Sequence, residues 1–132
     1  MKVKVFKSIK EIQKYYDEKT NTYVFKENGK YIDLVVFNFD LNIKANIIAW
    51  DINAKNISAC NIIASDIKAN NIDAYDIRVA NIEAYNIKAR DISYYAVCFT
   101  YYNLKCRSIE GRRSNAQHFS LDCELEVEED EK

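Results

Sequence analysis

The sequence predicts an all-β solenoid, in which the chain winds through stacked coils of short strands. The main observation is a five-residue phrase, Asp/Asn-Ile-x-Ala-x, that repeats ten times between residues 46 and 95. The isoleucines stand at positions 47, 52, 57, 62, 67, 72, 77, 82, 87 and 92. A period of five fits neither regular element, because it advances about 140° around an α-helix and sends successive isoleucines to opposite faces of a flat strand. Each repeat must therefore contain a bend.

The residue types within one repeat assign its inward and corner positions. Ile and the Ala two residues later share one face of a short extended segment, and only Val79 and Tyr94 replace Ala. The Asn or Asp before each Ile suits a bend, because its short side chain hydrogen-bonds nearby backbone and tolerates unusual dihedral angles. The chain has two glycines and no proline, so Asn and Asp have to form the corners. We expect an Ile column and an Ala column inside strands that stack about 4.8 Å apart.

The repeat resembles that of the pentapeptide-repeat family, in the variant register Asp/Asn-Ile-x-Ala-x, and the resemblance covers 46–95 directly. It implies a right-handed quadrilateral β-helix in which four repeats make one coil. On that basis we expect a coil of about four turns over 35–110. Its last turn is expected to continue the inward columns through larger residues such as Phe99 and Tyr102.

Residues 1–34 predict a small N-terminal cap that belongs to the same folded unit. Alternating apolar residues predict a strand at 3–6, and apolar residues at helical spacing predict a helix at 9–18. Asn28-Gly29 between two apolar runs predicts a tight β-hairpin. We expect this cap to cover the first coil, because otherwise the apolar core and unpaired strand edges would face water.

Residues 111–132 are expected to form a loop, a final strand and an acidic tail. Apolar residues alternate with polar and acidic ones from Phe119 to Val127. This pattern predicts one half-buried strand that packs on the last coil. Residues 128–132 are expected to be a charged tail.

The net charge of −1 is unevenly distributed, with +3 over residues 1–45, −1 over 46–95 and −3 over 96–132. This balance gives no reason to expect a membrane or nucleic acid as the partner. Four basic residues beside the acidic C-terminal strand are interpreted as a solvated loop: Lys105, Arg107, Arg112 and Arg113.

Without a long apolar stretch or a signal-peptide pattern, we expect a cytoplasmic protein with reduced cysteines. The Lys, Ile and Asn bias suggests a bacterial source.

Four potential metal ligands, Cys98, Cys106, His118 and Cys123, lie in the C-terminal third. Three cysteines and one histidine can hold a structural zinc ion. None of these spacings forms a CxxC pair, so the preferred interpretation places Cys98 and Cys123 in the core and leaves metal binding by the group open. The chain has no serine-nucleophile motif, phosphate-binding loop or metal-binding histidine pair, and His118 is the only candidate base for a cysteine nucleophile. We therefore predict no enzyme activity, no cofactor and no metal.

Aromatic residues at the outward variable position form the candidate protein-contact surface. Trp, Tyr and Arg dominate the energetics of protein interfaces, and in a 20-residue coil Tyr75 would align with Tyr95, and Trp50 with Arg90. The complete candidate surface is Trp50, Tyr75, Tyr85, Arg90 and Tyr95. We predict a non-catalytic scaffold or protein-interaction module with an unknown protein partner, and possible homo-oligomerisation through a coil end. The resemblance implies an alternative, a DNA mimic that inhibits DNA gyrase or topoisomerase. An inhibitor of another host enzyme is a further alternative, which the sequence does not separate from an interaction module.

Overall fold

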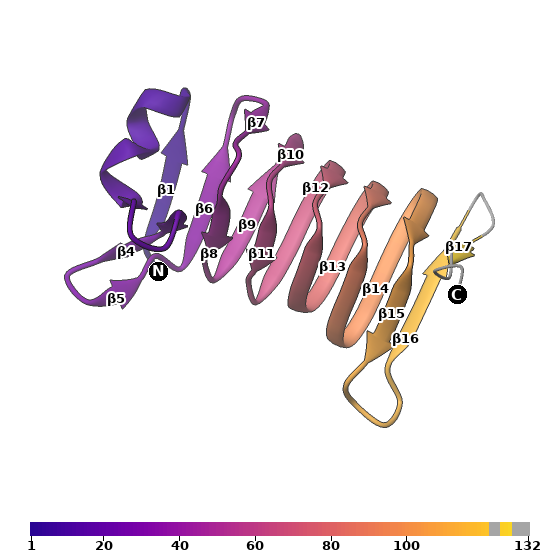
Figure 1. Cartoon of the computed structure of the whole chain (residues 1–132). Coiled ribbons are helices and arrows are strands. Elements are labelled where there is room, and N and C mark those ends of the chain that lie inside the picture. Colours follow the sequence, from indigo (N-terminus) through magenta and orange to yellow (C-terminus); the bar gives the residue numbers. More distant parts are fainter. Residues whose placement is uncertain (122–124, 128–132) are drawn as a thin grey trace.

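The computed structural model describes residues 1–121 and 125–127. It is a β-solenoid of about five turns with stacked parallel strands (Figure 1), which confirms the predicted all-β solenoid. The N-terminal elements lie at one end of the stack, and β16 and β17 lie at the other (Figure 1). The long axis of the molecule is therefore the stacking direction of the coils.

Each coil contains three five-residue repeats. Ile57 pairs in parallel with Ile72, and Ile72 pairs with Ile87, so each residue meets the one fifteen positions further on. The same spacing joins Ile62 to Ile77 on a second side. The coil is therefore three-sided, and the predicted four-sided coil of 20 residues is wrong. A period of five requires a bend in every repeat, but it does not determine how many repeats make one coil.

Three faces run along the coil, numbered in the order in which the chain visits them from residue 51. Face 1 contains β1 (Val3–Phe6), β6 (Leu34–Phe37), β9 (Asp51–Ala54) and β16 (Gln117–Ser120). Face 2 contains β7 (Leu41–Asn42), β10 (Asn56–Ser58) and β17 (Leu125–Val127). Face 3 contains β3 (Thr22–Val24), β8 (Asn46–Ile48), β11 (Asn61–Ile63) and β15 (Ser108–Gly111). The longer strands pass round corners, namely β12 (Asp66–Asp73), β13 (Asp76–Lys88) and β14 (Asp91–Cys106).

The two predicted inward columns form the core. All ten repeat isoleucines are buried, and none is more than 2% exposed. The alanine positions are also buried, except that Ala59, Ala64 and Ala89 are only partly buried. Burying one Ile side chain contributes about 1.5–3 kcal/mol. The Ile column is therefore the main source of stability along the coil.

The N-terminal cap closes one end of the core. Its helix, η1 (Ile9–Tyr15), is a 3-10 helix that is shorter than predicted, because the next two residues form β2 (Tyr16–Asp17) against β3. Three residues make one turn of a 3-10 helix, so Ile12 and Tyr15 share a side, and both are buried. Among the described residues this is the only helix, and it is too short to cross a membrane.

The predicted hairpin is confirmed at the tip of this cap. It joins β4 (Lys26–Glu27) to the antiparallel β5 (Lys30–Tyr31). Asn28 and Gly29 have φ values of 53° and 75°, and two positive values in succession are the requirement of a type I′ turn. The hairpin is shorter than expected, since the apolar residues on either side of it belong to the coil.

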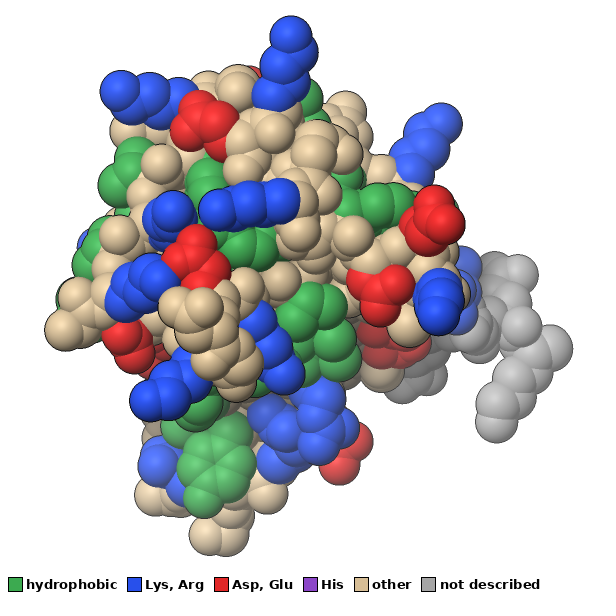
Figure 2. Space-filling view, turned by 90° about the vertical axis from the view of Figure 1, so that its left-hand side faces the viewer, with side chains coloured by type: hydrophobic (Ala, Val, Ile, Leu, Met, Phe, Trp, Pro, Cys, Tyr) green, Lys and Arg blue, Asp and Glu red, His purple; other side chains and the backbone are tan. Residues whose placement is uncertain are grey.

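Basic side chains spread over this N-terminal end, with a few acidic ones between them (Figure 2). Glu27 of the hairpin forms ion pairs with Lys2, with Lys4 at 3.3 Å and with Lys14 at 3.6 Å. It also accepts a hydrogen bond from the Tyr15 hydroxyl at 2.7 Å. The hydrogen bond from Lys2, followed by that from Tyr15, lowers the pKa of Glu27 to about 2. One carboxylate thus joins the hairpin, β1 and η1.

The last turns differ from the prediction. One extra residue enters β14 opposite the segment between Val79 and Asn81, and a second enters opposite the segment between Ala84 and Asn86. Because side chains alternate along a strand, a shift of one residue reverses which of them point inward. Cys98 is therefore in the core, whereas Phe99 is only partly buried and Tyr102 is exposed. The expected inward positions of Phe99 and Tyr102 are wrong.

The single C-terminal strand is also wrong, because the described residues of the segment form two strands on different faces of the coil. β16 lies on face 1 and β17 on face 2, and between them the Leu121 N–H donates to the Thr100 carbonyl at 2.8 Å. The alternating pattern extends across this corner, so it resembles one long strand in the sequence. Cys123 and the tail at 128–132 lie outside the described residues.

Candidate functional site

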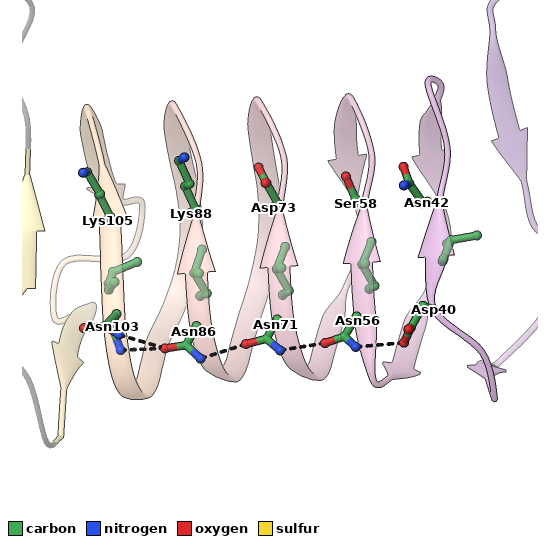
Figure 3. Close-up of a pocket in the computed structure, with 15 residues that line it drawn as sticks. Asp40, Asn42, Asn56, Ser58, Asn71, Asp73, Asn86, Lys88, Asn103 and Lys105 are labelled. Carbon is green, nitrogen blue, oxygen red and sulfur yellow. Dashed lines mark hydrogen bonds between the residues drawn. The ribbon is translucent and has the colours of Figure 1, made fainter.

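The corner between faces 1 and 2 carries a continuous ladder of side-chain amides (Figure 3). Asn103 donates to Asn86 at 3.1 Å, and Asn86 donates to Asn71 at 2.7 Å. Asn71 then donates to Asn56 at 2.7 Å, and Asn56 donates to Asp40 at 2.8 Å. An amide both donates and accepts, whereas a carboxylate only accepts. Asp40 is accordingly the last residue of the ladder, where the side chain only has to accept a hydrogen bond from Asn56.

This ladder forms one edge of a groove along face 2, and the other edge is the outward row Asn42, Ser58, Asp73, Lys88 and Lys105 (Figure 3). The residues between the two rows have buried side chains. The amides satisfy one another, and the outward row combines both charge signs. The asparagines are therefore explained by the stacking of the coils, without a ligand.

The other two corners stack carboxylates in pairs. Burial, and then the charge of Asp66, raises the pKa of Asp51. Burial, and then a hydrogen bond with Asp91, raises the pKa of Asp76. The pKa of Asp91 is lowered, chiefly because its carboxylate accepts a hydrogen bond from the Ser108 hydroxyl at 2.6 Å. Both pairs follow from the fifteen-residue spacing, which brings corner carboxylates together.

The two described cysteines of the candidate metal group lie in the core. Cys98 and Cys106 are buried, and burial raises the pKa of their thiols to about 12 and about 11. His118 lies with its Nδ1 atom 2.7 Å from the hydroxyl of Tyr94. Cys123 is outside the described residues, and the described ones contain no group of three or more His, Cys, Asp or Glu placed to hold a metal ion.

The predicted contact residues are exposed, but they do not form one surface. Trp50, Tyr75, Tyr85 and Tyr95 are 51%, 57%, 41% and 50% exposed, respectively. The three-sided coil distributes them over three corners. Trp50 and Tyr95 share the corner between faces 3 and 1, Tyr85 lies between faces 1 and 2, and Tyr75 and Arg90 lie between faces 2 and 3. The predicted alignments of Tyr75 with Tyr95 and of Trp50 with Arg90 are wrong, because they assume 20 residues per coil.

The corner between faces 3 and 1 forms a groove of about 430 Å³ with an aromatic residue at each end. Trp50, Ser65, Ala80 and Tyr95 follow one another on successive coils: the Ser65 N–H donates to the Trp50 carbonyl at 2.9 Å, and the Ala80 N–H donates to the Ser65 carbonyl at 2.7 Å. The two small side chains leave a low floor between the two rings. We call this site the corner groove; its other side-chain borders include Tyr31, Ile63, Arg78 and Arg112.

Neighbouring residues hold the walls of the corner groove in place. The Tyr31 ring from the cap hairpin meets the Trp50 ring edge-on, with 6.1 Å between their centroids. The Arg113 guanidinium lies 5.9 Å from the centroid of the Tyr95 ring. The Arg112 guanidinium donates a hydrogen bond to the carbonyl of Val79. Both aromatic ends and one basic side chain therefore have defined positions.

The lining of the corner groove has a positive charge, whereas the stacked carboxylates of Asp51 and Asp66 lie at the same corner but outside that lining. The lining includes Arg78 and Arg112 and no carboxylate. Arg78 is exposed and forms no ion pair with any of the described residues. Sequence reasoning missed Arg78, because only a fifteen-residue coil places it beside the corner of Trp50 and Tyr95.

Comparison of the chain with protein-family models, with curated proteins and with solved structures gives no match.

Proposed function

We propose that this protein is a non-catalytic interaction module, and that its corner groove binds a segment of a partner protein. The observation behind this proposal is the pairing of two half-exposed rings, Trp50 and Tyr95, with two arginines around a floor of Ser and Ala. Trp, Tyr and Arg are the residue types that contribute most to interface energies. The rings keep their spacing because the hydrogen-bonded coil carries them, so little order has to be gained on binding.

The charge of the coil favours this function over mimicry of DNA. Residues 46–95 carry six acids and five bases, and they span just over three coils, or about 16 Å. Duplex DNA carries about nine negative charges over that length. Asparagines also interrupt the corner carboxylates. The net charge of −1 over this segment is therefore far below the negative charge of duplex DNA of the same length.

A pull-down with matched variants tests the proposed function. The bait is the protein itself, presented to a lysate of cells that express it. Trp50→Ala with Tyr95→Ala removes both ends of the corner groove, whereas Tyr75→Ala with Tyr85→Ala removes two exposed rings from other corners. Circular dichroism first establishes that both variants fold.

We expect a partner that the parent and the Tyr75/Tyr85 variant retain and that the Trp50/Tyr95 variant loses. Equal retention by all three proteins would move the interface away from the corner groove. Failure of the parent to retain any protein in repeated experiments would contradict the function.

A further inference from the structure

The dimensions of the corner groove match an extended peptide that lies along the axis of the coil. Trp50 and Tyr95 are separated by three coil steps, or about 14 Å at ~4.8 Å each. Residues i and i+4 of an extended chain are also about 14 Å apart, at ~3.4 Å per residue, and residues i, i+2 and i+4 point the same way. A peptide can therefore place two side chains on the two rings and one side chain between them.

The residues at the middle of the corner groove determine which side chain of a bound peptide is favoured at position i+2. Ser65 and Ala80 are the smallest outward residues on this corner and are only partly buried. Arg78 lies two residues before Ala80 on the same coil, and Arg112 is held at the carbonyl of Val79. Both guanidinium groups therefore border the middle of the groove rather than its ends. Among the residues that line the groove, the side chain at i+2 meets two positive charges and no carboxylate.

The ends of the corner groove favour apolar side chains. Trp50 and Tyr95 each expose about half of their surface, so each ring can still cover a side chain. Rings of this size contribute to binding chiefly through the apolar area that they remove from water. A carboxylate at i+2 would gain charge-assisted hydrogen bonds from guanidinium donors.

We propose that the corner groove binds an extended peptide segment in which Asp or Glu is flanked two residues away, on both sides, by apolar side chains. This inference rests on the proposed function and adds the class of partner. The arginines select the central acid, the rings select the two apolar residues, and the three coil steps fix the spacing.

The test begins with selection from a displayed library of random nine-residue peptides on the whole protein. Trp50 is the only tryptophan in the chain, so its fluorescence reports on peptides that occupy the corner groove. We expect the selected peptides to share an acid with apolar residues at −2 and +2. A synthetic peptide with the core Leu-Thr-Glu-Thr-Leu is then compared with its Gln twin. We expect the Glu peptide to bind about tenfold more tightly, as one charge-assisted contact of ~1.4 kcal/mol would give.

Two variants assign the contacts. Arg78→Gln should reduce the tenfold preference for the Glu peptide, whereas Tyr75→Ala on another corner should leave the tenfold ratio unchanged. Added salt should weaken binding of the Glu peptide more than that of the Gln peptide, because salt screens exposed charge pairs.

The possible failures are distinguishable. Selected peptides that require Trp50 but lack the central acid would overturn this inference and leave the proposed function standing. A library that yields no peptide dependent on Trp50 or Tyr95 would contradict both. A 12-nucleotide oligothymidylate that changes Trp50 fluorescence where peptides do not would assign the site to single-stranded nucleic acid instead.

Discussion

The amide ladder at the corner of faces 1 and 2 makes a sharp prediction for one isosteric substitution. Asn71 accepts from Asn86 and donates to Asn56, each at 2.7 Å. Asn71→Asp exchanges the NH2 group for an oxygen. It preserves the acceptor for Asn86 and removes the donor for Asn56. The ladder would then contain two facing acceptors.

The expected cost follows from these contacts. Loss of one neutral hydrogen bond costs about 0.5–1.5 kcal/mol, and the new carboxylate would also face the amide oxygen of Asn56. Rotation of the Asn56 amide would only transfer the loss to its contact with Asp40. Asn71 is exposed, so water screens much of the repulsion. We expect a loss of about 1–2 kcal/mol at pH 7.

The loss should depend on pH. A protonated carboxyl at position 71 could again donate to Asn56, so its pKa in the folded protein should lie above the unfolded value of about 3.9. One carboxylate of each stacked pair at the other corners has a raised pKa, first through burial and then through its neighbouring carboxylate, namely Asp51 and Asp76. A raised pKa means that the substitution destabilises above that pKa, and that the deficit shrinks as the pH falls through it.

Urea denaturation of the parent and the variant at pH 7 and at pH 4 measures this deficit. Asp40→Asn is the matched control, because an amide at the end of the ladder still accepts from Asn56, and its effect should stay within about 0.5 kcal/mol. If Asn71→Asp unfolds at the same urea concentration as the parent, or if its deficit is equal at the two pH values, the ladder does not act as described.

Three further predictions concern the core and the cap. Ala74→Leu should overpack the inner column and lower the free energy of unfolding by about 1–3 kcal/mol; unfolding together with the parent in urea would contradict the inward position of Ala74. Gly111→Ala should also destabilise, because its Cβ would lie 2.9 Å from the hydroxyl oxygen of Tyr94; an unchanged melting temperature would show that the neighbours move aside freely. Glu27→Gln should lower the denaturation midpoint at pH 7, and because the folded pKa of Glu27 is lowered to about 2, the difference from the parent should vanish as the pH falls from above 4.5 through that value. A midpoint difference that persists near pH 2 would assign the effect to packing rather than charge.

The elements that depend on local chemistry could be predicted from the sequence. The strict Ile spacing gave the inward column, and Asn28-Gly29 gave the hairpin turn, because each is determined by a few adjacent residues. The last turn could not be predicted in this way. Two extra residues enter β14, and the first of them already reverses the inward direction; the apolar character of Phe99 and Tyr102 gives no sign of either. The exposed rings were identified individually, but grouping them required the length of the coil.

The distribution of Asn and Asp over the corner positions nevertheless indicates the length of the coil. With fifteen residues per coil, Asn56, Asn71 and Asn86 fall in one column, which allows an unbroken chain of amides that both donate and accept. With twenty residues per coil, Asn46 and Asn86 would flank Asp66, and a carboxylate would interrupt the chain. Since only amides can pass a hydrogen bond along such a column, the arrangement that groups the asparagines is the more stable one. In a corner-forming repeat, the distribution of the hydrogen-bonding corner residues is therefore a better guide to the number of sides than the period of the apolar residues.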